Sequence, residues 1–153
     1  MKYNPKKHNR RSTRLKNYDY SKAGFYFITL NCEDRHPLFG NIKNGVMCLN
    51  TFGTILHENW IETPNIRPNV AIGAFIVMPD HFHAIVHIIE SKGSKKQIGK
   101  FQSPSQTIGA IVRGLKGVVT KEIKATARAW DTDTDPRIDG KGCLLYRSDA
   151  ADE

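Results

Sequence analysis

Two histidines separated by one hydrophobic residue, His81 and His83, have the residue types and spacing for metal chemistry. They lie in an apolar, β-branched segment typical of a buried strand, so both side chains are expected on one face. Their Cα atoms would then be about 6–7 Å apart. Two neutral imidazoles at that spacing can bind one divalent cation, while Phe82 faces the core.

A structural role is the alternative interpretation of these histidines. A histidine among apolar residues is more often a hydrogen-bonded core residue, and an isolated His-x-His pattern is a weak motif. His87 shares the face of the pair but lies roughly 13 Å beyond His83 along an extended strand. We therefore expect His87 to be structural or to face a substrate.

Composition indicates an ordinary soluble domain of the reducing cytoplasm. The chain has 153 residues, 39% of them hydrophobic and 25% charged, which suits one domain with one core. No apolar run is long enough for a membrane span. The three cysteines are scattered and lack C-x-x-C spacing, which argues against a disulfide framework or a zinc knuckle.

The net charge of +8 predicts a polyanionic partner. Residues 1–17 form a basic arm without acidic residues, and such arms are either solvated tails or phosphate-binding segments. We favour nucleic acid, with a nucleoid-associated location. The candidate contacts in the arm are Arg10, Arg11, Arg14 and Lys16.

Strands and a hairpin are predicted in the first half of the chain. Residues 25–30 are aromatic and β-branched, as in a strand. Residues 38–42 and 46–49 flank Asn44-Gly45, the strongest short hairpin signal. A helix is then predicted from Asn50 or Thr51, which can cap it, to a point before Pro64.

The second half predicts two strands and a long helix. Residues 69–77 and 81–89 are the strands, separated by a short break. Ser103 can cap the helix, with Pro104 at its first position. The face of this helix opposite its apolar stripe carries Arg113 and Lys116, whose side chains are either solvated or in contact with phosphates. Its apolar stripe comprises Ile108, Ile111, Val112, Leu115, Val119 and Ile123.

This order of elements predicts an α+β, ferredoxin-like fold. One antiparallel sheet would carry both helices on one face, with the β-hairpin as an insertion, and leave its other face free for a substrate. The expected organisation is a basic arm (1–17), a catalytic domain (18–126) and an irregular tail (127–153).

Several motifs in this order resemble the single-tyrosine transposases of the IS200 type and their relatives associated with repetitive extragenic palindromes (REP). The resemblance covers roughly residues 10 to 125. Its residues are Arg10-Arg11-Ser12-Thr13-Arg14-Leu15, Tyr18-Asp19-Tyr20, Phe25 to Thr29, Asn50-Thr51-Phe52-Gly53, Val77-Met78-Pro79-Asp80-His81-Phe82-His83, Ser103-Pro104-Ser105 and Arg113-Gly114-Leu115-Lys116.

The resemblance implies DNA transposition by metal-dependent nicking and strand transfer. His81 and His83 would hold Mg²⁺ or Mn²⁺ against a phosphodiester of single-stranded or hairpin DNA, and a tyrosine would form a phosphotyrosine link. Some members of the family are homodimers and others act alone, so the resemblance is compatible with a homodimer or a monomer. Imidazole is not the preferred ligand of Mg²⁺, so a third, oxygen ligand is expected. Candidates for further ligands are His57, Glu58, Gln106 and, less readily, Asp80.

The resemblance ends after Ala125. The family carries its tyrosine in a Trp-Gln-Arg-Asn-Tyr-like segment on a following helix, whereas residues 129–136 here are acidic and turn-forming. Residues 143–153 resemble translated read-through of non-native sequence, and we expect the native tyrosine to be missing. Tyr146 is the single tyrosine downstream of the histidines and the remaining candidate nucleophile. The alternative function is a non-catalytic nucleic-acid-binding module on the same fold.

Overall fold

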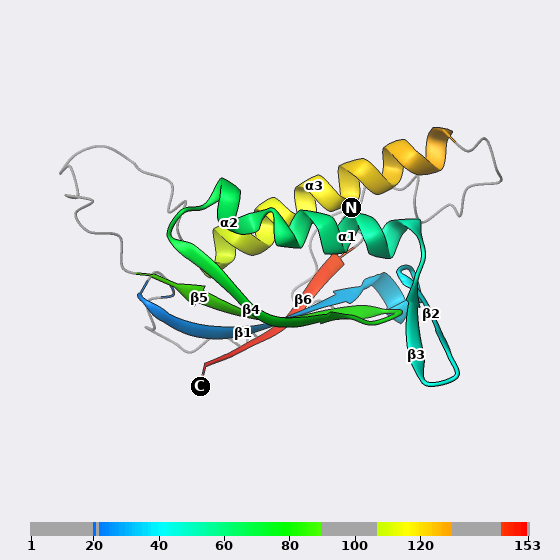
Figure 1. Ribbon diagram of the computed structural model, residues 1–153. Helices are drawn as coiled ribbons and strands as arrows, with labels where there is room; N and C mark the ends of the chain where they lie inside the picture. Colours follow the sequence, from blue (N-terminus) through cyan, green and yellow to red (C-terminus); the bar gives the residue numbers. More distant parts are fainter. Residues whose placement is uncertain (1–19, 21, 90–106, 130–144, 153) are drawn as a thin grey trace, which may run out of the picture.

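The computed structural model describes residues 20, 22–89 and 107–129, and the backbone of 145–152. These residues form an α+β fold in which the helices cover one face of an antiparallel sheet (Figure 1). The sheet has four strands in the order β4 (Val70–Val77), β5 (His81–Ile88), β1 (Gly24–Cys32) and β6 (Leu145–Asp152).

The chain order confirms the predicted ferredoxin-like arrangement. Two β-α-β units follow one another, with β1 and β5 in the centre of the sheet and β4 and β6 at its edges. The hairpin of β2 (Gly40–Lys43) and β3 (Val46–Leu49) is inserted after β1 and stands at one end of the sheet (Figure 1). Its turn residues Asn44 and Gly45 have φ values of 51° and 77°, which the predicted Asn-Gly turn requires.

Alternation along the central strands divides the sheet into a core face and an open face. In β5, Phe82 is fully buried and its ring lies 5.2 Å from that of Trp60 in α1 (Thr51–Ile61). In β1, Ile28 and Leu30 are also fully buried. The side chains between these residues, including both histidines, therefore lie on the face away from the helices.

The first helix begins where its cap was predicted. The side chain of Asn50 accepts a hydrogen bond from the Gly53 amide at 2.9 Å and donates one to the Leu38 carbonyl at 2.9 Å. The helix ends at Ile61, before Pro64 as predicted. Pro64 then lies in the first turn of a short helix that the sequence did not predict, α2 (Thr63–Ile66).

The long helix α3 (Ile108–Ala129) buries every residue of its predicted apolar stripe. It packs beside α1, where the Asn59 amide donates to the Glu122 carboxylate at 2.8 Å. The predicted start at Ser103 and Pro104 lies outside the described residues. The helix continues past residue 126, the expected end of the domain, because Ala127 still packs in the core.

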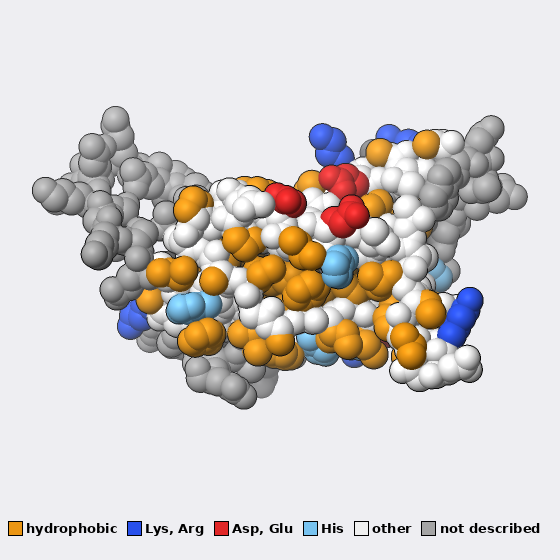
Figure 2. All heavy atoms as spheres, viewed as in Figure 1, with side chains coloured by type: hydrophobic (Ala, Val, Ile, Leu, Met, Phe, Trp, Pro, Cys, Tyr) orange, Lys and Arg blue, Asp and Glu red, His pale blue; other side chains and the backbone are white. Residues whose placement is uncertain are grey.

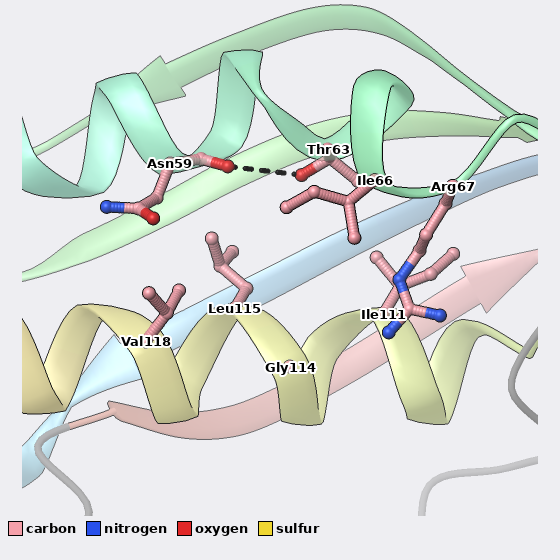
Figure 3. Close-up of a pocket in the computed structure, with 8 residues that line it drawn as sticks. All are labelled: Asn59, Thr63, Ile66, Arg67, Ile111, Gly114, Leu115 and Val118. Carbon is pink, nitrogen blue, oxygen red and sulfur yellow. Dashed lines mark hydrogen bonds between the residues drawn. The ribbon is translucent and has the colours of Figure 1, made fainter.

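A groove of about 190 Å³ separates α3 from α1 and α2 (Figure 3). Arg67 crosses it and donates to the Ala110 carbonyl at 3.2 Å. Gly114 gives the guanidinium room, since a Cβ atom there would lie 3.1 Å from a guanidinium nitrogen of Arg67. Arg67, the residue after α2, thus bridges the groove to α3 on the helical side of the sheet.

The expectation of an irregular tail is wrong for residues 145–152. They form β6, which pairs antiparallel with β1 from Tyr26 to Cys32. The physical reason is the edge of β1, whose backbone groups need a partner on the side away from β5. In the described residues, no helix is long and apolar enough to cross a bilayer.

Candidate metal centre

The two predicted histidines lie together on the open face. His81 is paired with Asn31 of β1, and His83 with Thr29. Their ring centroids are 4.8 Å apart, and the ring planes are inclined by 72°. The prediction that both imidazoles share one face of one strand is confirmed.

Each imidazole has one nitrogen held by a neighbouring oxygen. Nδ1 of His81 lies 2.5 Å from Oδ1 of Asp80, and Nδ1 of His83 lies 2.8 Å from Oγ1 of Thr29. A proton on Nδ1, donated to these oxygens, leaves the lone pair of each ring on Nε2. This is the usual arrangement of metal-binding histidines, in which an oxygen behind the ring fixes its tautomer and orientation.

Asp80 links His81 to the guanidinium of Arg35. Its second oxygen lies 3.5 Å from the guanidinium of Arg35, in the 3₁₀ turn η1 (Glu33–Arg35), where Arg35 has a φ of 56°. The hydrogen bond with His81, and then the charges of His81 and Arg35, lower the pKa of Asp80. Asp80 is therefore an anion at neutral pH and can accept the Nδ1 proton of His81.

His83 is in the form that binds metals. Burial, and then repulsion from His81 in its protonated form and from Arg35, lower the pKa of His83. Its imidazole is consequently neutral at pH 7 and needs to lose no proton when it binds a cation.

The donors fit a divalent transition ion better than Mg²⁺. Across residues 22–89 and 107–129, no group of three His, Cys, Asp or Glu side chains is placed to hold a metal. Imidazole nitrogens suit transition ions such as Fe²⁺ and Zn²⁺, whereas Mg²⁺ prefers oxygen ligands, as Mn²⁺ also does. Further ligands would have to be oxygens of another kind, such as amides, water or phosphate.

Two candidate ligands lie on the wrong face of the sheet. The ring of His57 is 5.4 Å from that of Phe75, which packs 6.1 Å from the buried Phe82. His57 and its neighbour Glu58 thus belong to α1, on the helical side. Asp80 binds behind His81 as a hydrogen-bond partner. Gln106 lies outside the described residues.

The predicted DNA-binding residues are not brought to the histidines. Arg113 and Lys116 lie on α3, in the layer that covers the opposite face of the sheet. The arm residues Arg10, Arg11, Arg14 and Lys16 lie outside the described residues. Tyr146 lies in β6, where its backbone pairs with Asn31, but its side chain is also outside the described part of the chain.

The open face also carries apolar side chains that the sequence analysis did not single out. Phe25 and Phe27 of β1 are 61% and 38% exposed, Ile85 opposite Phe27 is 36% exposed, and Ile76 opposite His83 is 49% exposed. Phe27 stacks on His83 with centroids 5.2 Å apart. Phe25 stacks on His87 at 4.2 Å, so His87 faces this surface as one of its predicted roles requires.

Figure 2 views the sheet from its edge and shows hydrophobic side chains across the middle and lower part of the molecule, with acidic side chains above them over the helices. Phe25 and Phe27 have odd residue numbers, as His81 and His83 do, and the register of β1 against β5 places all four on the open face. This shared numbering was the signal in the sequence that pointed to the two phenylalanines. Asn31, Thr29 and Arg35 gave no such signal, because a sequence does not show which residues of β1 lie opposite β5.

The chain was compared with protein-family models, with solved structures and with curated sequences. No protein-family model matches the chain. The fold is similar to the REP-associated tyrosine transposase bound to a REP hairpin, at 20% identity and a TM-score of 0.46. That match covers 90% of this chain but spans 63% of the transposase. A candidate transposase from Deinococcus radiodurans R1 is 15% identical with a TM-score of 0.45, over 92% of this chain and 83% of that structure.

At these TM-scores neither likeness decides the activity. An uncharacterized protein of Haemophilus influenzae (strain ATCC 51907 / DSM 11121 / KW20 / Rd) is 42% identical over 138 residues, which cover 85% of this chain and 77% of the relative. Identity at this level over most of both chains indicates common descent. The chain therefore belongs to the same family as this Haemophilus influenzae protein.

Proposed function

We propose that this chain is the core of a metal-dependent enzyme that nicks single-stranded DNA and transfers the strand through a phosphotyrosine link, as in transposition. The observation that carries the proposal is the histidine pair on the open face, in which both Nδ1 atoms have oxygen partners. Mn²⁺ or Mg²⁺ is the proposed cofactor, and single-stranded or hairpin DNA the proposed substrate.

In this proposal, the two histidines bind the cation, and neighbouring residues position the histidine rings. His81 and His83 would hold the cation, with Nε2 as the free nitrogen of each ring, while Asp80 and Thr29 keep the rings in place. A bound cation would draw charge from a phosphodiester oxygen. Arg35 is 62% exposed at its side chain and only 3.5 Å from Asp80, so its guanidinium can attract the same phosphate.

The proposed reaction also needs a tyrosine hydroxyl. Its oxygen would lose its proton and bond to phosphorus while a sugar oxygen leaves and gains a proton as a free hydroxyl, so the number of phosphodiesters is conserved and the strand can later be rejoined. Tyr146 is the candidate in this chain, because its backbone lies two strand spacings, about 10 Å, from His81 across Asn31. The Trp-Gln-Arg-Asn-Tyr-like segment of the resembling transposases is the alternative source.

The exposed aromatic face favours a second candidate, a nucleic-acid-binding module without catalysis. Four-stranded sheets that present aromatic residues on their central strands stack unpaired bases on them. Phe25 and Phe27 occupy such positions on β1. In this case His83 and His87 would support the two phenylalanines by stacking and would bind no metal.

A cleavage assay separates the two candidates. A labelled hairpin oligonucleotide with a single-stranded flank is incubated with Mn²⁺ and three forms of the protein. These are the chain as it stands, the Tyr146→Phe variant, and a chimera carrying the Trp-Gln-Arg-Asn-Tyr-type segment. His81→Ala and His83→Ala are introduced into each of the three forms.

Mn²⁺-dependent nicking that leaves a covalent protein–DNA adduct, and that either histidine variant abolishes, is the expected result. Loss of the adduct in Tyr146→Phe would assign the nucleophile to Tyr146. DNA binding that ignores Mn²⁺ and both histidine substitutions, with no nicking by any form, would favour the binding module.

A further inference from the structure

Asn31 is an unusual residue for its position. It lies near the end of β1, a central strand, where amide side chains are disfavoured. Its Oδ1 atom is buried and has no hydrogen-bond partner, one of two such side-chain atoms in the described residues. A buried polar oxygen without a partner is costly and is normally satisfied by a donor, a water or an ion.

The register places Asn31 beside the histidine pair. Asn31 is directly opposite His81, and both belong to the open face. The amide of the next residue, Cys32, bonds the carbonyl of Asp80 at 2.8 Å, so that pair is hydrogen-bonded. Asn31 and His81 are then a non-hydrogen-bonded pair, the class in which Cα atoms are about 4.5 Å apart and side chains are closest.

The neighbouring pair shows what a side chain at this position can reach. Thr29, two residues before Asn31, is opposite His83 and touches its Nδ1 at 2.8 Å. The corresponding nitrogen of His81 is already bound to Asp80. The Asn31 amide oxygen is thus not used to orient a ring and remains free to act as a ligand itself.

We infer that Asn31 supplies an oxygen ligand, through Oδ1, to a divalent cation of the Mn²⁺ class held by His81 and His83. This inference rests on the proposed function, because it requires the histidines to bind a metal. A neutral amide oxygen adds a hard donor to two imidazoles, which suits Mn²⁺ and supplies part of what Mg²⁺ would need.

The test is a titration of Mn²⁺ into the full chain, with free Mn²⁺ followed by electron paramagnetic resonance. Asn31→Leu is expected to weaken binding at least tenfold, and Asn31→Asp to strengthen it, because a carboxylate keeps the shape and adds a charge. Asn41→Leu, the same change at an exposed position of β2, is expected to leave the affinity unchanged.

The outcomes distinguish this inference from the proposal beneath it. Wild-type affinity in Asn31→Leu would overturn the role of Asn31 while leaving the histidine site intact. If Asn31→Leu does not fold, unchanged or weaker binding in Asn31→Asp would overturn it equally. Absence of Mn²⁺ binding by the unaltered chain, or binding that survives the His81→Ala/His83→Ala double substitution, would overturn the metal proposal itself.

Discussion

The two histidines share a strand but have different supports. Asp80 gives His81 an anionic partner, which also contacts Arg35, whereas His83 has the neutral hydroxyl of Thr29. An anion behind an imidazole raises the basicity of its other nitrogen. His81 should therefore be the stronger metal ligand of the pair, and its strength should depend on Asp80.

Asp80→Asn is expected to lower the affinity for Mn²⁺ by about 10- to 100-fold while the fold is retained. Isothermal titration calorimetry with Mn²⁺ measures the change. Asp34→Asn is the matched control, because Asp34 is exposed and its φ of 51° is one that asparagine tolerates. Equal affinity in Asp80→Asn and Asp34→Asn would show that the carboxylate does not support the site.

The buried thiol of Cys32 leads to a prediction about the pH dependence of stability. Burial raises the pKa of its thiol to about 12, from an ordinary value of 9.0. The folded protein thus holds this proton more tightly than the unfolded chain, so stability is full below pH 9 and falls as pH rises from 9 towards 12.

Urea unfolding at pH 8 and at pH 10.5 measures this loss of stability, and Cys32→Val should reduce the difference between the two pH values.

A second experiment tests the burial of Cys32 directly. In a Cys143→Ser background at pH 8, a thiol reagent should modify the partly exposed Cys48 and spare Cys32 until urea unfolds the protein. Rapid modification of Cys32 in the folded protein would contradict the burial that raises its pKa.

A sequence predicts an element well where its apolar residues recur with a clear period or where it carries a turn motif. The stripe of α3, the alternation of β5 and the Asn44-Gly45 turn each appear in the structure where they were predicted. Helix α2 and strand β6 were not predicted, because one is a single turn begun by Pro64 and the other exists through pairing with β1. Partners such as Thr29 and Asn31 depend on the register of β1 against β5, which no local pattern encodes.

Two glycines in helices should respond to alanine in opposite ways. Gly117 of α3 has open space around it, so Gly117→Ala should stabilise the protein by about 0.5–1 kcal/mol through helix propensity. At Gly53 of α1 a Cβ atom would lie 2.2 Å from the Phe39 carbonyl oxygen. Gly53→Ala should therefore destabilise the protein by roughly 1–3 kcal/mol, despite the better propensity.

Urea denaturation of the two variants provides the comparison. The sign of the difference is the test, since propensity alone predicts a gain at both positions. A gain in Gly53→Ala would mean that α1 does not approach the segment before β2 as closely as the structure shows.

At the scale of the whole molecule, the sheet has one face covered by helices and one face with exposed apolar side chains. The protein is strongly basic, with a net charge of +8. Basic groups bind nucleic acid through phosphates in a salt-dependent way, whereas stacking on aromatic residues depends little on salt. The two contributions can therefore be separated by measurement.

Phe25→Ala and Phe27→Ala are each expected to weaken binding of a single-stranded oligonucleotide by about 1–3 kcal/mol without changing its dependence on salt. Fluorescence anisotropy at several salt concentrations gives both quantities. Val46→Ala serves as the control, because Val46 is 64% exposed but lies on the hairpin. Binding that is equally tight in all three variants would exclude the open face as the platform for bases.

The most direct test of the account is the position of a bound cation. Crystals of the full chain grown with Mn²⁺ can be examined by anomalous scattering at the manganese edge. A single peak within bonding distance of Nε2 of both His81 and His83 is the predicted result. A peak elsewhere, or none while the two rings keep their hydrogen bonds to Asp80 and Thr29, would contradict it.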